Sequence, residues 1–598
     1  MNQEAFWNSD DKLPIKQTSV SIPTLNGGTF SGGQRIQINI PSNVEYIQPR
    51  ESYLKFDFKL KLPTGAAVNP TYLQLDEVLG GQSLIKDIRI YSGGAGKILL
   101  EEIQDYNTLT NIKYTYESND VLRQKRALTE GSTCHSVANR ATLGTTTSHK
   151  NSTETNPYFK HNTTVKLADA DYQTVKCLLP LNTGLFSSGK VLPVLLTEGL
   201  VLDIILEDSQ NVFRQLDQVS RFTKLNNLPV FHSIDGLDPG GGMVSGTAPA
   251  TIYLTQDNSM RGLKNCPFCI GERIGFVSTT LFADPANEEK GPFIAPLAVP
   301  ADEFIITGIK MGPAAVANVD KLIQITCSGK ITSATATQVP AADGTWSVFS
   351  QSVSSSEDYG DVSYTLSNVE MVCQQLEMPQ GYTAKMMSMM KEGGSMNYDF
   401  LSFTNFKYSQ LSGDLVSNIR LPLNMTKAKA ILSVPTDAQN YTANARISGK
   451  DTYEILNAPK SRDWVNTSQK SGLVGVSDFI TDYQFFYDGK LNPSRKVNCS
   501  KTSSQVSISQ QQIIELEKAL VMSNITPFSF KGFNENFVIG RALSLHNGIY
   551  DTRGRDFNLQ VEYLGQGKAI AQKNKLWMNF VSHIRTIQFK GDGISLLV

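Results

Sequence analysis

The sequence predicts an all-β protein. Hydrophobic and polar residues alternate with a period of two in many short segments, and this pattern gives a strand one buried and one exposed face. Turns rich in Gly, Pro, Ser and Thr separate the segments, and helical patterns are rare. Such short strands and turns are typical of sandwiches and barrels. The strand patterns lie at 83–91, 174–181, 199–207, 302–311, 321–331, 362–378, 417–425, 428–435, 481–489, 536–545, 556–565 and 584–598.

Two regular amphipathic segments stand near the start of the chain. Ile36, Ile38 and Ile40 alternate with polar residues, and a second run extends over 52–62. This run would span about 36 Å at about 3.3 Å per residue, which indicates a large sheet. We expect the two segments to be the opening pair of the first sandwich. The second run should place Leu54 to Leu62 in the core and turn outward Lys55, Lys59 and Lys61.

Helical spacing occurs at only a few places. Leu99, Ile103, Tyr106 and Leu109 recur every three to four residues and predict a helix within 99–128, directly after a strand. A second helix is expected over 507–523, with Ser509 as its N-cap. The methionine-rich segment 386–396 predicts a short helix that fills a gap in the core, in preference to a soft binding surface.

Composition limits the possible functions. The 598 residues exceed one ordinary core, and 55 Lys and Arg residues balance 56 Asp and Glu residues, so we expect no direct nucleic-acid binding. No segment reaches the roughly 18 to 20 apolar residues of a membrane span, and the acidic start argues against a secretory signal. Seven scattered cysteines indicate reduced thiols and synthesis inside a cell.

The segment 266–269, Cys-Pro-Phe-Cys, is the most tempting metal or redox motif. A structural zinc site usually needs a second pair of ligands, and none accompanies it. A redox role would need a thioredoxin-like βαβ context, which is absent. We therefore interpret Cys266 and Cys269 as two ordinary thiols and expect no bound zinc.

The remaining candidates for chemistry are weaker. The glycine-rich stretch 93–100 fails the phosphate-loop pattern, with Tyr91 in place of the first glycine and Ile98 in place of Ser or Thr. Two acid pairs are interpreted as solvated surface charge: Asp169 with Asp171, and Glu101 with Glu102. The histidines are isolated, at 135, 149, 161, 232, 546 and 583. The sequence thus predicts no catalytic, cofactor-binding or metal site, no cofactor, and no enzyme.

The order of the segments resembles a known family. The stretches 83–109 and 175–207 are similar to the first jelly roll of the double jelly-roll major capsid proteins of icosahedral DNA viruses, which 362–382 would close. The stretches 417–435, 481–495 and 583–598 resemble the second jelly roll. The phrases "GLFSSGKVLPV" and "YDGKLNPS" look closest to virophages and polinton-like viruses.

The resemblance implies two tandem eight-stranded jelly rolls with short flanking helices. The expected parts are an N-terminal arm at 1–29, a first jelly roll at 30–380 and a second at 381–598, which is rich in linker at 434–470. A β-rich insertion at 211–360 would form an exposed tower on the first jelly roll. Phe6 and Trp7 lie in the arm, either to anchor a neighbour or to pack on the chain itself.

The resemblance also implies a function. Three chains would form a pseudo-hexagonal capsomer that tiles an icosahedral virus shell, with neighbouring trimers, penton proteins and minor capsid proteins as partners. The protein would be made and assembled inside the host cell and would reside in the virion.

Two other functions remain open from the residues alone. A carbohydrate-binding or carbohydrate-active β-sandwich would need an aromatic platform, and the chain has only four tryptophans, Trp7, Trp346, Trp464 and Trp577. A surface adhesin would more often show sequence repeats, and none with a fixed period is present.

Overall fold

The structure is a computed structural model of the 598-residue chain. It describes residues 16–61, 73–76, 78–94, 96–117, 119–132, 175–215, 363–379, 381–411, 414–437, 473–475, 480–499, 510–528, 536–543, 550–563, 575–591 and 593–597, together with six strands between 232 and 350. None of the helices in these residues is long and apolar enough to cross a membrane.

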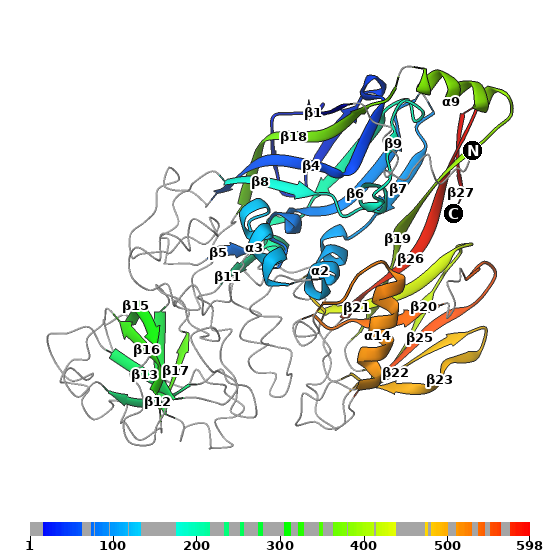
Figure 1. The fold of residues 1–598 in the computed structure, drawn as a ribbon. Coiled ribbons are helices and arrows are strands. Elements are labelled where there is room, and N and C mark those ends of the chain that lie inside the picture. Colours follow the sequence, from blue (N-terminus) through cyan, green and yellow to red (C-terminus); the bar gives the residue numbers. More distant parts are fainter. Residues whose placement is uncertain are drawn as a thin grey trace.

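The first half of the chain forms a sandwich of two antiparallel sheets (Figure 1). One sheet contains, in order across it, β1 (Lys16–Pro23), β18 (Ser363–Glu377), β4 (Tyr46–Lys61) and β8 (Val175–Pro180). The facing sheet contains β3 (Arg35–Ile40), β10 (Leu200–Leu206), β6 (Ile85–Ser92) and β7 (Leu99–Ile103). The short strands β2 (Thr29–Ser31) and β9 (Leu192–Pro193) add to the first sheet, against β18 and β4.

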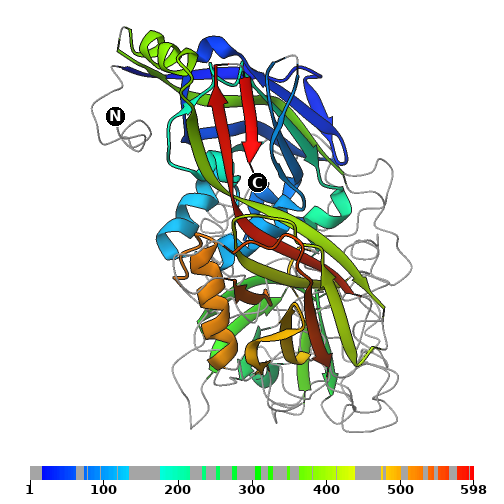
Figure 2. The ribbon, with the colours of Figure 1, turned by 90° about the vertical axis from the view of Figure 1, so that its right-hand side faces the viewer.

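The second half repeats this arrangement. One sheet contains β19 (Met396–Gln410), β26 (Lys575–Lys590), β21 (Ala428–Asp437) and β24 (Ile539–Ala542), and β27 (Gly593–Leu597) pairs with β26. The other contains β20 (Val416–Leu421), β25 (Phe557–Tyr563), β22 (Ile480–Tyr487) and β23 (Lys490–Asn498). Figure 2 shows the long strands β19 and β26 running from beside the first sandwich into the second.

The strand order identifies the fold. The eight main strands of each half can be lettered B to I along the chain: β1, β3, β4, β6, β7, β8, β10 and β18 in the first half, and β19 to β26 in the second. Both halves then read B-I-D-G in one sheet and C-H-E-F in the other. This is the arrangement of a jelly roll, two Greek keys wrapped into a sandwich. The chain is a double jelly roll. The predicted fold class is thereby confirmed from the topology itself.

The helices lie in the connections between strands. The connection after β7 contains α2 (Tyr106–Tyr116) and α3 (Asp120–Thr129), and the connection after β23 contains α14 (Gln510–Met522). Each half therefore has a hairpin followed by a helix at the same place in the strand order. Shorter elements are η1 (Ser42–Val44), η2 (Gly80–Leu84), α6 (Gly184–Ser187), α7 (Ser209–Val212) and α9 (Tyr382–Lys391).

The two opening segments form strands, but they do not pair. β3 pairs with β10 in the C-H-E-F sheet and forms a bridge to Thr24 on its other side, whereas β4 lies in the other sheet between β18 and β8. Leu54, Phe56 and Phe58 are buried as expected, and each side chain contributes roughly 1.5 to 3 kcal/mol of burial. Lys55 lies on the outer face, where its ammonium is 3.0 Å from the carboxylate of Glu370 on β18.

The structure differs from two other expectations about where strands and helices begin. Leu99–Ile103, expected to begin a helix, is β7 and pairs with β6; the helix begins at Tyr106. The first sheet also begins within the range expected for the N-terminal arm, because β1 pairs along the length of β18. Phe6 and Trp7 lie outside the described residues.

The other two expected helices are present. α14 lies within the predicted range 507–523, and α9 forms at the methionine-rich segment. Met386 and Met390 of α9 are buried, and the Tyr46 hydroxyl is 3.9 Å from the Met386 sulfur. α9 thus covers one end of the first jelly roll, where the chain passes to the second.

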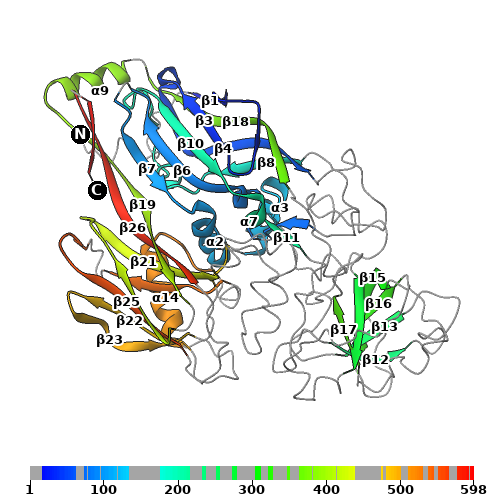
Figure 3. The ribbon, with the colours of Figure 1, turned by 180° about the vertical axis from the view of Figure 1, so that it is seen from behind.

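The insertion in the first jelly roll contains a closed barrel. Its strands, in order around the barrel, are β12 (His232–Leu237), β13 (Thr251–Thr255), β16 (Lys321–Cys327), β15 (Phe304–Met311), β14 (Arg273–Ser278) and β17 (Trp346–Ser350). It lies between β10 and β18 in the chain and apart from both sandwiches in space (Figure 3). A β-rich insertion was expected here.

Connection lengths differ sharply between the two ends of each jelly roll. Strand direction alternates, so the connections C-D, E-F and G-H lie at one end and the connections B-C, D-E, F-G and H-I at the other. In the first jelly roll, the C-D and E-F connections are short and comprise only residues 41–45 and 93–98. The F-G and H-I connections are long and comprise residues 104–174 and 207–362. The long connections meet: β5 (Leu73–Leu75) of D-E pairs with β11 (Phe213–Gln215) of H-I.

Candidate functional site

The most elaborate polar site in the described residues is the contact between the two jelly rolls. We call it the seam. β7, α2 and α6 of the first jelly roll face β19 and β26 of the second and the segments around α14 (Figure 1). The residues that meet are hundreds of positions apart in sequence, and most of their polar side chains are buried.

Glu101 on β7 is the centre of the seam. Its side chain is fully buried, and its carboxylate accepts hydrogen bonds from the backbone N–H groups of Gly184 (2.8 Å) and Leu185 (2.9 Å), at the start of α6. It also accepts a 2.7 Å bond from the hydroxyl of Ser402 on β19. One carboxylate therefore links three segments from both jelly rolls.

Burial and hydrogen bonding act in opposite directions on this carboxyl group. Burial raises the pKa of Glu101, and the three donors together with the charge of Arg585 offset part of that rise. Arg585 on β26 donates to the carbonyl oxygen of Leu100 at 2.9 Å, so it crosses the seam beside the glutamate. The expectation that Glu101 is a solvated surface charge was wrong, because its partners come from distant segments.

Gly184 allows the closest approach of the two jelly rolls. A Cβ built on this glycine would lie 1.9 Å from the carbonyl oxygen of Leu401 on β19 and 2.8 Å from Glu101 Oε1. No real side chain fits at such a distance. Thr183, the residue before it, caps α6 by accepting a bond from the Phe186 N–H at 3.2 Å. The cap and the glycine together present the two backbone donors to Glu101.

Asp105 forms a second buried link across the seam. It lies between β7 and α2 with a positive φ of 51°, and its N–H donates to Asp87 at 2.9 Å. Its carboxylate accepts from the Asn405 amide at 2.6 Å and lies 2.7 Å from the Lys407 ammonium, both on β19. This buried charge is therefore paired and hydrogen-bonded, as its burial requires.

Tyr116 and Asn111 connect α2 to the segments around α14. The Tyr116 hydroxyl donates to the carbonyl oxygen of Asn536 at 3.0 Å, and the Asn536 amide donates to Asn111 at 3.0 Å. The Tyr116 carbonyl oxygen in turn accepts from the N–H of Phe528 at 2.9 Å. The helices in the F-G connections thus hold the two jelly rolls together at this end of the seam.

A second buried glutamate lies beside the seam, at the end of α3. Glu130 accepts from the Tyr114 hydroxyl at 2.8 Å and from the Gln82 amide at 3.2 Å. The Arg126 guanidinium lies over the Tyr114 ring, 3.5 Å from its centroid. Burial raises the pKa of Glu130 to about 7, in spite of the bond from Tyr114 and the charge of Arg126.

Glu130 should make the stability of the protein depend on pH. Its folded-state pKa of about 7 lies above the ordinary glutamate pKa of 4.5, so the folded chain holds a proton that the unfolded chain releases between these values. The stability from this group is fully present below about pH 4.5 and is lost as the pH rises to about 7, about 3 kcal/mol in total. We expect Glu130→Gln to flatten the fall in urea midpoint from pH 5 to pH 8.

Glu392, exposed at the end of α9, offers a matched control. Glu392→Gln should retain the wild-type pH dependence. A Glu130→Gln protein whose urea midpoint still falls as steeply as the wild type would show that Glu130 is not the group responsible.

The structure places several of the residues singled out from sequence. His583 is buried on β26 with its Nε2 2.9 Å from the Thr404 hydroxyl, and burial lowers its pKa to about 3. Trp577 is fully buried, and its indole N–H donates to Gln410 at 2.8 Å, so it is a core residue and no sugar platform. Cys266, Cys269, Asp169 and Asp171 lie outside the described residues.

Metal ligands do not cluster in the part of the chain that the structure describes: no three His, Cys, Asp or Glu side chains there are placed to hold an ion. The described free cysteines, Cys177, Cys373 and Cys499, are all buried. Burial raises the pKa of the Cys373 thiol to about 12, which is typical of an unreactive core cysteine.

The sequence contains no local pattern that predicts the seam, since none of the hydrogen bonds across it joins neighbours in the chain.

Comparison with known proteins gives no sequence match: no protein-family model and no curated protein matches the chain. Many solved structures match in fold, among them the following three. The Faustovirus major capsid protein is 8% identical with a TM-score of 0.44, covering 97% of this chain and 92% of that one. The Sputnik virophage structure is 8% identical with a TM-score of 0.41, covering 98% and 89%. The mavirus major capsid protein is 10% identical with a TM-score of 0.35, covering 98% and 91%.

These likenesses are weak in both sequence and superposition. The assignment of the fold therefore rests on the strand order of the two jelly rolls alone.

Proposed function

We propose that this protein is a major capsid protein, three copies of which form a pseudo-hexagonal capsomer of an icosahedral virus shell. The observation that carries the proposal is the repeated B-I-D-G and C-H-E-F strand order in one chain. Two similar units per chain give six per trimer. A trimer can then occupy a six-sided position in a lattice with only three identical chains.

The seam supports this proposal because it fixes the two jelly rolls as one unit. Buried links such as those of Glu101 and Asp105 hold β7 and α6 against β19. A buried charge whose partner is removed costs several kcal/mol, so such links favour one relative arrangement. A tile in a closed shell needs a fixed shape of this kind, whereas an enzyme of two domains often needs them to move.

The lengths of the connections between strands support the distinction of an outer end of the jelly rolls from an inner end. All the longest connections of the first jelly roll are at the end where D-E, F-G and H-I meet, and the barrel is part of H-I. We infer that this end faces outward and that residues 211–360 form the exposed tower. The outward end would carry host-facing contacts, and the remaining sides would meet neighbouring trimers, penton proteins and minor capsid proteins in the virion.

The oligomeric state tests the proposal. Light scattering on the purified full-length chain should give a mass of about 200 kDa, three times the 65.8 kDa of one chain. A stable trimer buries roughly 2,000 to 5,000 Å² at each obligate contact, so we expect no dissociation at micromolar concentration. A monomer at every concentration would contradict the proposal.

The tower should be dispensable for trimer formation. We expect replacement of residues 235–250 by a short Gly/Ser link to leave the mass of the trimer unchanged, since the jelly-roll sheets and the seam do not include this segment. Light scattering and size-exclusion chromatography would measure it. Loss of soluble trimer would contradict this prediction.

A further inference from the structure

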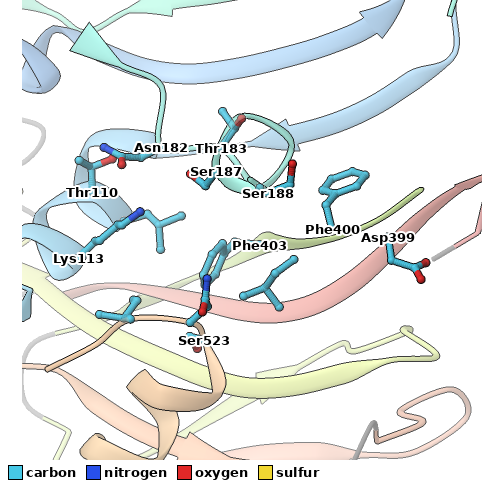
Figure 4. Close-up of a pocket in the computed structure, with 15 residues that line it drawn as sticks. Thr110, Lys113, Asn182, Thr183, Ser187, Ser188, Asp399, Phe400, Phe403 and Ser523 are labelled. Carbon is cyan, nitrogen blue, oxygen red and sulfur yellow. The ribbon is translucent and has the colours of Figure 1, made fainter. Parts of the chain in front are cut away.

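The seam contains a cavity of about 180 Å³ between the two jelly rolls, partly open to solvent (Figure 4). Its walls come from α2 and the 182–188 segment of the first jelly roll, and from β19 and residues 523–525 of the second. An engineered apolar cavity of about 150 Å³ binds benzene, so this volume suits a ligand with a single ring or a short chain.

The lining combines apolar and polar side chains. Leu109, Phe400 and Phe403 provide apolar surface, and Ser187 and Lys113 are among the polar residues. In Figure 4 the Lys113 side chain extends from α2 into this space. Lys113 is the only cation among the lining residues.

The Lys113 ammonium has no direct partner among the described residues. It is half-buried and makes no hydrogen bond or ion pair with any residue that the structure describes. Burial lowers its pKa, the charge of Glu117 opposes this as the next largest influence, Arg126 and Arg50 lower the pKa further, and Glu130 raises it. A group in this position gains from a bound anion, which supplies the missing charge and hydrogen-bond acceptor.

The single acidic side chain in the lining does not fill that role. Asp399 on β19 accepts a hydrogen bond from the hydroxyl of Thr586 on β26, and Figure 4 shows it at the far side of the cavity from Lys113. One free cation suits a monoanion. A phosphate dianion would usually require several charged or N–H donors, such as an arginine fork.

We propose that the cavity binds a small organic carboxylate, with its carboxylate on Lys113 and a short apolar or aromatic body against Phe400 and Phe403. Because the two jelly rolls supply opposite walls, the ligand contacts both and strengthens the seam. A ligand that binds only the folded, assembled seam raises stability by mass action.

Titration of the purified full-length chain with benzoate and hexanoate tests this. Isothermal titration calorimetry should show one saturable site per chain, and the melting temperature should rise with ligand concentration. Benzyl alcohol, which has the ring without the charge, should bind at least about ten-fold more weakly, as expected for the loss of a charge-assisted hydrogen bond. Equal binding of benzoate and benzyl alcohol, or no saturable binding of either carboxylate, would overturn the proposal.

Two variants locate the site. Lys113→Met should weaken benzoate binding about ten-fold or more and leave benzyl alcohol unaffected, whereas Lys125→Met, at an exposed lysine on α3, should change neither. Ser187→Leu, which fills part of the cavity and keeps the lysine, should weaken both compounds. Unchanged benzoate binding in both Lys113→Met and Ser187→Leu would show that the carboxylate binds elsewhere.

Discussion

Glu101→Ala should lower the free energy of unfolding by about 3 to 5 kcal/mol, the cost of breaking a buried, hydrogen-bonded charge site. The substitution leaves the N–H groups of Gly184 and Leu185 and the hydroxyl of Ser402 without their acceptor inside the seam. It also removes the larger of the two negative charges, those of Glu101 and Glu102, that act on the partly buried Arg585. Urea unfolding followed by tryptophan fluorescence and circular dichroism would measure the loss.

The neighbouring residue is a matched control. Glu102, also on β7, pairs with Arg89 on the same sheet at 2.8 Å and is partly exposed. Glu102→Ala should cost no more than about 1 kcal/mol, as is usual for such a pair. Similar losses in Glu101→Ala and Glu102→Ala would mean that the seam does not depend on the buried carboxylate.

Gly184→Val should have an effect of similar size by a different cause. A Cβ at this position meets the Leu401 carbonyl oxygen at 1.9 Å, and that atom belongs to the backbone of β19, a 15-residue strand that pairs with β26 along its whole length. Either α6 or β19 must move, which breaks the two N–H bonds to Glu101. We expect a loss of about 4 kcal/mol and a lower melting temperature, with protease cleavage at the connection between the jelly rolls.

Gly96 offers the corresponding control. It lies in the turn between β6 and β7, where a Cβ meets nothing within 4 Å and the φ is ordinary. Gly96→Val should leave the melting temperature within about 1 °C of the wild type, since surface substitutions change stability little. A Gly184→Val protein as stable as Gly96→Val would show that the close approach at the seam is not as described.

The sequence predicted the all-β class and most central strands because burial leaves a period of two. The alternation of Leu54, Phe56 and Phe58 is the clearest example, and all three are buried. The sequence could not reveal which strands pair with one another. A buried face looks the same in either sheet of a sandwich, so the alternation assigned β3 and β4 to the first sandwich without showing that they lie in opposite sheets.

Two of the strands that the sequence analysis did not predict, β23 and β7, illustrate the physical reasons. β23 contains mostly exposed polar residues, because it is the edge strand of its sheet. β7 consists of Leu, Glu and Ile, which are compatible with a helix, and only its pairing with β6 makes it a strand. Tertiary pairing overrides local propensity in such cases.

The seam was invisible to sequence reasoning for a related reason. Glutamate is almost never fully buried unless it is paired, so Glu101 was expected to be exposed. Its partners Gly184 and Ser402 are 83 and 301 positions away. No local pattern contains such information, whereas the tandem order of strands and helices, from which the resemblance to capsid proteins came, is spread over the whole chain.

A low-resolution electron-microscopy image of the purified protein tests the central claim most directly. Class averages of the full-length chain should show a particle with three-fold symmetry and a pseudo-hexagonal outline, built from six similar lobes, with the towers on one side. Single particles of two lobes with no three-fold symmetry, at concentrations where the chain is intact and folded, would contradict the assignment as a capsid protein.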